Sequence, residues 1–346
     1  MKQYKVIIWG LGSVGQYALK MVQEKRSLAL AGVIDVDPAK VGRDAGEVAG
    51  VGPVGVTVES DPAAVLQKEA DLVLLYVNTT ADPADLTPAR YAPVTDLICQ
   101  ALAAGKNVLT TMPVYYSQKS APELFEKIDS CAKQHGVTYT QQGIFPGLFN
   151  PYLPVVFASM TGKVSKVIIN GGQDDAFNTS AWVKLFAYGQ APESFDPSFL
   201  KSMLLPYYGP TVQHIADRCG IEYDDYQEIH QLYTTDVELN PPCGKVAPGT
   251  ISAHSFDMAC YKDGVEVTGF HFVHKVCHDL QPEPPCFDGY RIEGEPNLEV
   301  VIKGMIPEDV PYASSAAPSV NLIPQVAEAA PGFIDALDLP AAKPVL

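Results

Sequence analysis

Short strand-like runs and amphipathic segments alternate along the first half of the chain. Residues 6–9, 28–34, 72–77, 107–111 and 137–141 are strand-like, and the first three are continuously apolar, as is typical of parallel strands buried on both faces. The segments between them place apolar residues three and four positions apart, which predicts amphipathic helices. This alternation predicts an α/β fold with a Rossmann-type, doubly wound and mostly parallel sheet.

The pattern changes after about residue 147, where strands with one polar and one apolar face become frequent. Two pairs of such strands are separated by turn residues and therefore predict hairpins. The pairs are 251–261 with 265–276, around Lys262-Asp263-Gly264, and 290–293 with 298–303, around residues 294–297. We expect a second, α+β domain built on an antiparallel sheet.

These patterns predict three segments. Residues 1–146 form the first domain, residues 147–312 form the second domain, and residues 313–346 return to the first domain. The tail is expected to be helical over residues 319–330, with Pro324 either kinking that helix or starting it.

A glycine-rich turn separates the first strand from the first helix. Gly10, Gly12 and Gly15 have the spacing of the dinucleotide-binding fingerprint. In that fingerprint the first glycine permits the tight turn, the second lets the backbone approach a pyrophosphate, and the third allows the helix to pack closely. Ser13 and Val14 complete the helix N-terminus, where N–H groups bind phosphate oxygens.

Asp35 follows the second strand at the distance the fingerprint requires, and a carboxylate there accepts hydrogen bonds from the adenine ribose. This favours NAD. Lys40 and Arg43 lie close behind and are either phosphate ligands, which keeps NADP possible, or ordinary surface charges. Further cofactor contacts are expected at the carboxyl ends of the strands and in the tail. They are Asn78, Thr79, Thr111, Met112 and Asn321.

Composition narrows the choice of partners. The chain has 346 residues, with 40 acidic against 24 Lys and Arg side chains, and a formal net charge of -16. Such a charge repels nucleic-acid backbones and anionic membranes, so neither is expected as a partner. The longest apolar runs are too short to span a bilayer, and no secretion signal is visible. Seven cysteines without a Cys-x-x-Cys pair favour reduced thiols, and we expect a cytoplasmic protein.

Several segments resemble one family. Residues 41–50 (VGRDAGEVAG) resemble the run after the second strand in dihydrodipicolinate reductase-like proteins. Residues 290–296 (YRIEGEP), 320–324 (VNLIP) and 330–332 (APG) resemble the branch containing 2,4-diaminopentanoate dehydrogenase and the native amine dehydrogenases. The resemblance implies a Rossmann domain, a substrate domain, a cleft between them and often a homodimer.

The chain departs from this family at the positions that carry its chemistry. It lacks the His-His-x-x-Lys-type segment of dihydrodipicolinate reductases, which argues against lysine biosynthesis. The amine dehydrogenases carry a glutamate just after the strand that here ends at Thr111, whereas this chain continues Met112-Pro113-Val114. Met112 also takes the place of the lysine of the Glu-Lys-Pro turn in the glucose-fructose oxidoreductase family. Neither catalytic residue therefore carries over.

Tyr115 and Tyr116 are the nearest titratable side chains to the missing glutamate and are our candidate proton donors. Histidines of the second domain are an alternative. His271 and His274 are three apart on a strand and face opposite sides, so they cannot share a metal, and no metal site is expected. A structural role is the commoner one for such a histidine. Asp174 and Asp175 either orient an amine or hydroxyl or belong to a polar loop.

Aromatic side chains suggest an apolar substrate pocket. Its expected residues are Phe145, Phe149, Trp182, Tyr207 and His271. The leading hypothesis is an NAD(P)-dependent oxidoreductase that transfers a hydride to or from a C=O or C=N carbon of a small, mostly apolar molecule. Ketone reduction or alcohol oxidation is favoured, because the glutamate is missing. The alternatives are an amine dehydrogenase and a non-catalytic NAD(P)-binding sensor.

Overall fold

The computed structural model divides the chain into two compact units. Unit 1 comprises Met1–Phe149 and Tyr312–Leu346, and unit 2 comprises Asn150–Pro311. The boundaries expected from the sequence were after residues 146 and 312. The structure describes residues 2–77, 88–111, 115–178, 181–198, 205–277, 279–282, 284, 288–305 and 312–346. Within these ranges no helix is long and apolar enough to cross a membrane.

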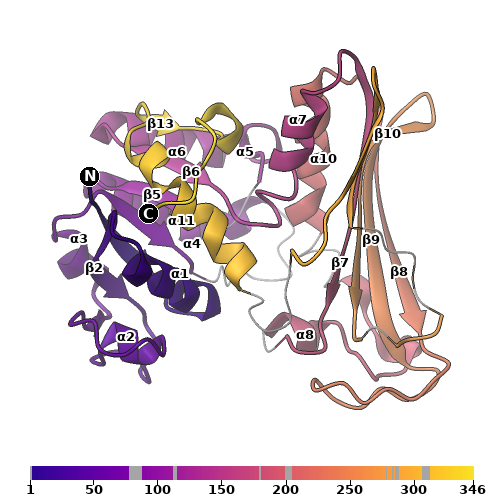
Figure 1. Cartoon of the computed structure of the whole chain (residues 1–346), viewed down its shortest axis with the longest axis horizontal. Coiled ribbons are helices and arrows are strands. Elements are labelled where there is room, and N and C mark those ends of the chain that lie inside the picture. Colours follow the sequence, from indigo (N-terminus) through magenta and orange to yellow (C-terminus); the bar gives the residue numbers. More distant parts are fainter. Residues whose placement is uncertain are drawn as a thin grey trace. The chain divides into compact units, whose positions relative to one another are not determined.

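Unit 1 contains the expected Rossmann-type sheet (Figure 1). Its strands pair in parallel in the order β13-β6-β5-β4-β1-β2-β3. The strands are β1 (Tyr4–Trp9), β2 (Leu28–Ile34), β3 (Val58–Glu59), β4 (Leu72–Leu75), β5 (Asn107–Thr110), β6 (Thr138–Gln141) and β13 (Gly332–Phe333). The central strands β1 and β4 are almost completely buried, because helices cover both faces of a doubly wound sheet.

The helices of unit 1 present apolar faces to this sheet. Ile98, Ala101 and Leu102 of one helix and Ile128 and Ala132 of another lie in a common core with the strands. The helices are α1 (Ser13–Glu24), α2 (Ala45–Val48), α3 (Pro62–Leu66), α4 (Ala92–Ala103), α5 (Ser117–Ser120), α6 (Pro122–His135) and α11 (Ala313–Ala327), with 3-10 turns η1 (Pro88–Tyr91) and η3 (Ala336–Asp338).

Local capping signals were partly informative. Asp61 caps α3, as its Asp-Pro sequence indicates, and its side chain accepts a hydrogen bond from the N–H of Ala63. The spacing of Ser120 and Glu123 suggests a capping box, but that interpretation is wrong. Ser120 ends the preceding turn α5, and its hydroxyl donates to the carbonyl of Tyr115 instead.

The C-terminal segment completes unit 1. Helix α11 lies beside α1, although about 300 residues separate them (Figure 1). Ser319 of α11 shares a hydrogen bond of 2.6 Å with the hydroxyl of Tyr76, and the last carbonyl, of Leu346, accepts from the N–H of Ser27. Pro324 lies inside α11, so the alternative in which it starts the helix is wrong.

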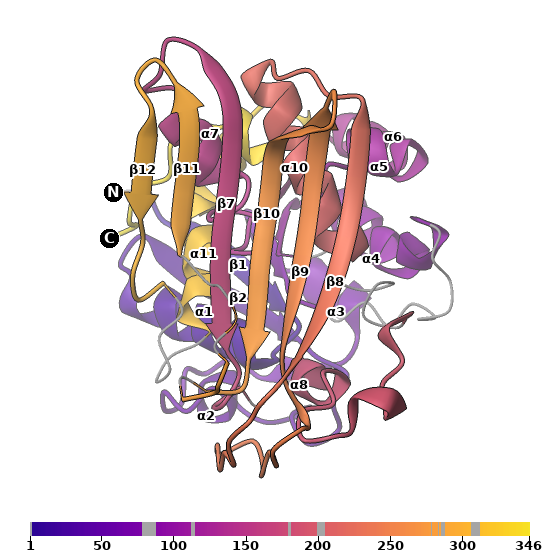
Figure 2. The same cartoon turned by 90° about the vertical axis from the view of Figure 1, so that its right-hand side faces the viewer.

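Unit 2 is built on a sheet of strand order β12-β11-β7-β10-β9-β8 (Figure 2). The expected antiparallel sheet is a mixed one, because β7 and β10 pair in parallel whereas the other neighbours are antiparallel. The strands are β7 (Val164–Asp174), β8 (Asp225–Thr234), β9 (Ile251–Lys262), β10 (Val265–Lys275), β11 (Gly289–Gly294) and β12 (Leu298–Val301). Strand β8 is not among the strands expected from the sequence.

Helices pack on one face of this sheet. In Figure 2, α7 (Tyr152–Ala158) and α10 (Leu205–Cys219) lie behind the strands. The ring of Tyr208 meets that of Phe270 edge to face at 5.5 Å, and the hydroxyl of Thr268 donates to the carbonyl of Val212. The remaining helical segments are α8 (Ala181–Leu185) and the 3-10 turn η2 (Pro192–Ser194).

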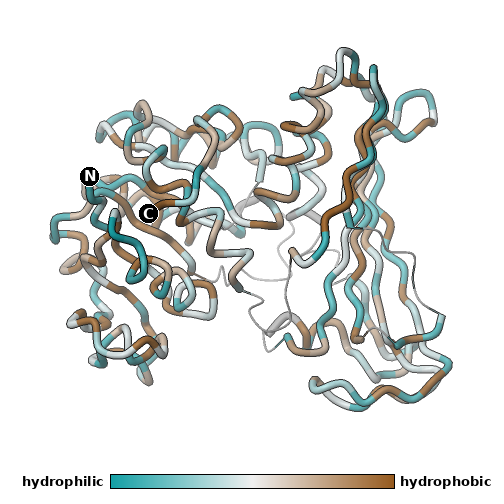
Figure 3. The backbone as a smooth tube through the Cα atoms, viewed as in Figure 1, coloured by the Kyte–Doolittle hydropathy of each residue, from teal (hydrophilic) through white to brown (hydrophobic). Residues whose placement is uncertain are grey.

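The opposite face carries a charged cluster. Hydropathy changes from residue to residue along these strands (Figure 3), and His271 points away from the face that Phe270 and Phe272 share with α10. Its Nδ1 lies 2.8 Å from a carboxylate oxygen of Asp257, and its Nε2 lies 2.8 Å from one of Glu266. Burial lowers the pKa of His271, but the two carboxylates outweigh it and raise that pKa to about 9.

This cluster makes the stability of unit 2 depend on pH. Since the pKa of His271 rises from 6.5 to about 9 on folding, its stabilisation is fully present below pH 6.5 and is lost as pH rises through 9. We expect His271→Gln to lower the free energy of unfolding at pH 6 by about 2 kcal/mol, allowing for partial solvent screening, and far less at pH 10. Denaturant unfolding at both pH values measures this. An equal loss at both would contradict it, and His135→Gln on α6 is the control.

Candidate active site

The turn between β1 and α1 is held by two close backbone approaches. Gly10 has a φ of +98°, and a Cβ there would lie 2.6 Å from the carbonyl oxygen of Tyr76. A Cβ on Gly15 would collide with the carbonyl oxygen of Gly10. Both positions therefore require glycine for conformation and packing, and together they bring the start of α1 against the end of β1.

Gly12 differs from its two neighbours in the motif. It is the N-cap of α1, and a Cβ there would meet no protein atom within 4 Å. Helix α1 has no side-chain cap and no acidic residue in its first turn, and both Gly12 and Ser13 are exposed, with Val14 half-buried. Its N-terminal N–H groups and positive dipole end are therefore open to an anion, which fits the pyrophosphate of a dinucleotide.

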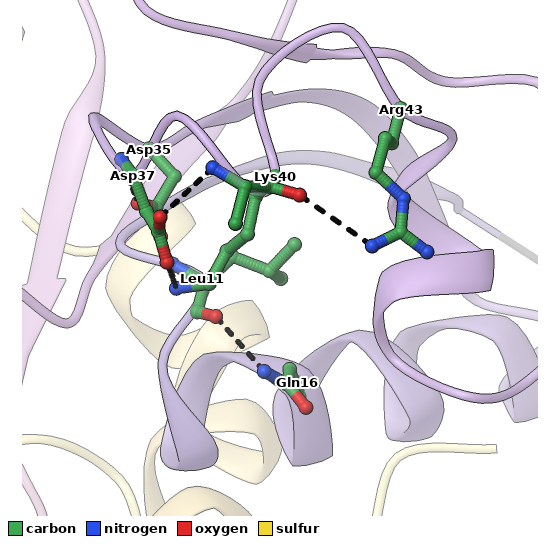
Figure 4. A network of polar contacts seen from close by, with 7 residues as sticks. Leu11, Gln16, Asp35, Asp37, Lys40 and Arg43 are labelled. Carbon is green, nitrogen blue, oxygen red and sulfur yellow. Dashed lines mark hydrogen bonds and ion pairs between the residues drawn. The ribbon is translucent and has the colours of Figure 1, made fainter.

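Asp35 joins this turn to the end of β2 (Figure 4). Its Oδ2 accepts a hydrogen bond of 2.7 Å from the N–H of Leu11, and its Oδ1 accepts one of 2.9 Å from the N–H of Asp37. Burial raises the pKa of Asp35, but these backbone bonds and the Lys40 ammonium outweigh it and hold that pKa below its ordinary value. Asp35 is therefore an anion, and of its about four acceptor positions one on Oδ1 remains for a ribose hydroxyl.

Lys40 and Arg43 have different settings. The Lys40 ammonium lies 3.2 Å from Asp35 and 3.4 Å from Asp37, and is half-buried. Arg43 is exposed, and its guanidinium donates a long hydrogen bond of 3.5 Å to the carbonyl of Ala39. Lys40 thus lies within reach of the group that Asp35 would hold, and partly neutralises the carboxylate that would repel a 2′-phosphate.

The other expected cofactor contacts are only partly described. Thr111 is half-buried and lies next to Gly143. A Cβ added to Gly143 would lie 3.3 Å from the Cβ of Thr111. Asn321 lies on α11, and its side-chain Oδ1 accepts a hydrogen bond from the N–H of Val345. Asn321 therefore holds the C-terminal segment, a role that the sequence did not suggest. Asn78, Thr79 and Met112 lie outside the described residues.

Tyr115 and Tyr116, the expected proton donors, form the turn before α5 and are both half-buried. Tyr116 has a φ of +52°, which is rare for a residue with a side chain. Their carbonyl oxygens accept hydrogen bonds from the Ser120 hydroxyl. These hydrogen bonds hold the backbone of the turn. The catalytic role of the two phenols stays a prediction.

Among the expected pocket residues, the structure describes the side chains of Phe145, Phe149 and His271. Phe149 is 2% exposed and packs edge to face on Phe145, with ring centroids 5.0 Å apart, so Phe149 is a core residue. Both ring nitrogens of His271 are engaged by carboxylates, which leaves neither for a substrate. Trp182 lies on α8 and Tyr207 on α10, and their side chains lie outside the described residues.

The structure also connects a group that sequence reasoning left as separate candidates. Asp175 and His274 are far apart in the chain, yet a carboxylate oxygen of Asp175 lies 3.0 Å from Nδ1 of His274. Both are buried, at 0% and 6% exposure. The signal available in the sequence was a pair of acids after a strand and a histidine near the end of another. Within the described ranges, His, Cys, Asp and Glu side chains form no cluster that could hold a metal ion.

Two family models match this chain. Residues 4–84 match the N-terminal domain of dihydrodipicolinate reductase, and residues 189–346 match the C-terminal domain of 2,4-diaminopentanoate dehydrogenase. In both regions the chain is similar to the dihydrodipicolinate reductase-like branch of the diaminopentanoate and amine dehydrogenases. The relatives named as dehydrogenases and the match of the N-terminal domain support a nicotinamide-dependent oxidoreductase.

Two relatives align with this chain over nearly their whole length. An amine dehydrogenase of Streptomyces virginiae is 26% identical over 96% of this chain and 95% of its own. A 2,4-diaminopentanoate dehydrogenase of Acetoanaerobium sticklandii is 25% identical over 100% of this chain and 96% of its own.

Solved structures share the fold. An amine dehydrogenase from Mycobacterium smegmatis matches with a TM-score of 0.77 at 22% identity, covering 98% of this chain and 97% of that one. A scyllo-inositol dehydrogenase from Lactobacillus casei matches with a TM-score of 0.55 at 16% identity, covering 93% and 88%.

Gly12→Val tests the glycine turn. A Cβ at this position meets no protein atom within 4 Å and the φ of −75° suits valine, so we expect the fold to be retained while the space in front of α1 is filled. We expect the affinity for NADH to fall on the order of 100-fold or more, in fluorescence titration, with little change in thermal unfolding. Gly15→Val is the contrasting control, since it should lower thermal stability. Wild-type NADH affinity in Gly12→Val would contradict the assignment.

Proposed function

We propose that this chain is an NAD(P)-dependent amine dehydrogenase, which interconverts a small amine and its ketone. The observation that carries the proposal is the match of residues 189–346 to the C-terminal domain of 2,4-diaminopentanoate dehydrogenase. Relatives named as dehydrogenases of amines match over nearly the whole chain, which supports it. In this proposal unit 1 binds the dinucleotide and unit 2 binds the substrate. The homodimer that the resemblance implies stays a prediction.

One observation favours a second function, the carbonyl reductase that the sequence analysis preferred. Residues 112–114 are Met-Pro-Val, with no carboxylate where the amine dehydrogenases carry a glutamate. A ketone reductase needs only a proton donor for the developing alkoxide, whereas an amine dehydrogenase must also take a proton from ammonium. The two functions therefore differ in their requirement for ammonium.

The bound nicotinamide would supply the hydride, and the protein supplies position and charge. Gly12, Ser13 and Val14 would hold the pyrophosphate, and Asp35 would accept a hydrogen bond from a ribose hydroxyl. Since the Lys40 ammonium lies beside Asp35, we infer a preference for NAD with measurable use of NADP.

The cofactor preference can be shifted from either side of this ion pair, in opposite directions. Asp35→Asn keeps an acceptor for the N–H of Leu11 but removes the negative charge, so we expect NADH to bind about tenfold more weakly and NADPH more tightly. Lys40→Ala should weaken NADPH more than NADH. Dissociation constants from fluorescence titration of both variants measure this, and unchanged NADH and NADPH affinities in Asp35→Asn would overturn the ribose assignment. Arg43→Ala is the exposed control.

The reaction is tested by its dependence on ammonium. We expect NADH oxidation with cyclohexanone, acetophenone or pentan-2-one to require ammonium chloride, and NAD reduction to occur with the matching amines or with 2,4-diaminopentanoate. Chromatography of the product should show an amine. Oxidation of NADH at the same rate without ammonium, with an alcohol as product, would replace the proposal by a carbonyl reductase. NADH binding without turnover of any of these compounds would favour the sensor.

A further inference from the structure

A buried carboxylate organises one edge of unit 2. Asp175 directly follows β7 and accepts four side-chain hydrogen bonds. Its Oδ1 accepts from the amides of Gln173 and Asn178, both at 2.9 Å. Its Oδ2 accepts from the hydroxyl of Tyr188 at 2.9 Å and from Nδ1 of His274 at 3.0 Å. Because a carboxylate offers about four acceptor positions, Asp175 is saturated and serves to hold its neighbours.

The bond to Asp175 fixes the state of His274. An ionised carboxylate only accepts hydrogen bonds, so the proton of a neutral His274 ring lies on Nδ1 and its Nε2 carries a lone pair. That Nε2 is buried and has no hydrogen-bond partner among the described residues. Leaving a buried polar atom unsatisfied costs about 1–3 kcal/mol, so it is rarely retained without a function.

Aromatic rings hold the imidazole of His274 in place. Phe186 stacks on it with ring centroids 4.5 Å apart and planes at 27°, and Phe272 meets it edge to face at 4.9 Å. Phe186 is itself fixed, because its carbonyl accepts a hydrogen bond of 2.8 Å from Nε2 of His254. The other ring nitrogen of His254 then accepts from Nε2 of His230 at 3.0 Å. The imidazole of His274 is thus oriented by a carboxylate on one side and by packing on its faces.

We propose that Nε2 of His274 exchanges a proton with the substrate during amination, and that Asp175 is its positioning residue. The inference rests on the proposed function. A carboxylate bonded to Nδ1 with Nε2 left free is the arrangement that orients a histidine general base in unrelated enzymes. It supplies the proton acceptor that the Met112-Pro113-Val114 sequence does not.

The proton balance closes on one imidazole. Neutral His274 takes a proton from ammonium, and the resulting ammonia adds to the ketone carbonyl to give a carbinolamine. The His274 imidazolium then returns the proton to the carbinolamine hydroxyl as the C–O bond breaks, so that water leaves and an iminium ion remains. A hydride from the bound nicotinamide would then convert the iminium carbon to that of the neutral amine. A phenol, with an ordinary pKa near about 10, is a donor at neutral pH but not a ready acceptor for the first step.

Three titratable side chains near the Asp175–His274 pair keep their charge around neutral pH. Burial raises the pKa of Tyr188 and of Tyr208 on α10 well above the neutral range. Burial also lowers the pKa of His254 to about 3, so this ring stays neutral. Between pH 5 and 9 none of these three groups changes its charge.

The first test compares His274→Gln with His271→Gln, on opposite faces of the same strand β10. In His274→Gln we expect kcat for ammonium-dependent reduction of the ketone that the wild type uses to fall by about 10²–10⁴-fold. The NADH dissociation constant should stay unchanged, and the acidic limb of the pH profile of kcat/KM should disappear. His271→Gln should keep both the rate and the limb. A His274→Gln enzyme with the wild-type rate and pH profile would overturn the inference, while ammonium dependence in the wild type would still support the proposed function.

Chemical rescue separates proton transfer from a structural role. In His274→Gly, added imidazole should restore turnover, and a series of substituted imidazoles should restore it in proportion to their basicity. Rescue that follows the size of the imidazole and ignores its pKa would assign His274 a packing role only. Asp175→Asn should lower kcat less than His274→Gln does and should shift the pH profile, since the wrong ring nitrogen is then protonated in part of the population.

Nitrogen NMR of ¹⁵N-histidine-labelled enzyme decides the matter even if no compound of the panel is turned over. We expect one histidine, absent from the His274→Gln spectrum, with Nδ1 protonated and Nε2 bare. Its Nε2 resonance should shift when cyclohexylamine is added to the NAD complex. A His274 ring with a protonated Nε2 in the free enzyme, or one that does not respond to the amine, would overturn the inference.

Discussion

The close approach of α1 to the end of β1 is the constraint on which the rest of unit 1 depends. Gly15 lies against the carbonyl of Gly10, and Gly10 lies against the backbone of Tyr76, so three backbone segments converge without side chains between them. Asp35 then bonds the N–H of Leu11 and fixes the turn to β2. The position of the helix N-terminus, and with it any dinucleotide bound there, follows from these contacts.

Much of unit 1 could be predicted because its signals are local. The apolar run at residues 28–34 has the bounds of β2, and the Asp61-Pro62 pair caps α3 as expected. The strand β8, Asp225–Thr234, was missed because it lies at a sheet edge and has only half-buried and exposed positions, without a regular alternation. The parallel pairing of β7 with β10 could not be predicted either, since it is a contact between segments about 100 residues apart.

In the candidate site, too, the residues with local signals could be predicted and those that depend on strand pairing could not. The fingerprint glycines and Asp35 are recognisable because their spacing is short and each has a defined backbone task. The partnership of Asp175 with His274 depends on the register of β7 against β10, in which His274 pairs with Gln173 and Lys275 with Asp174. No periodicity in the sequence encodes that register. The resemblance in sequence is enough to predict the branch. It does not predict the proton acceptor, because Met112 follows the strand after which the amine dehydrogenases carry a glutamate.

Unit 2 is an insertion within unit 1, and this sets an order during synthesis. The ribosome makes β1 to β6 first, then all of residues 150–311, and only afterwards α11 and β13. Until those last residues emerge, the surfaces of α1 and β6 that α11 and β13 cover remain exposed to solvent. A chain truncated near residue 312 would therefore contain every strand of unit 2 but an unfinished unit 1, with apolar surface available to chaperones or proteases.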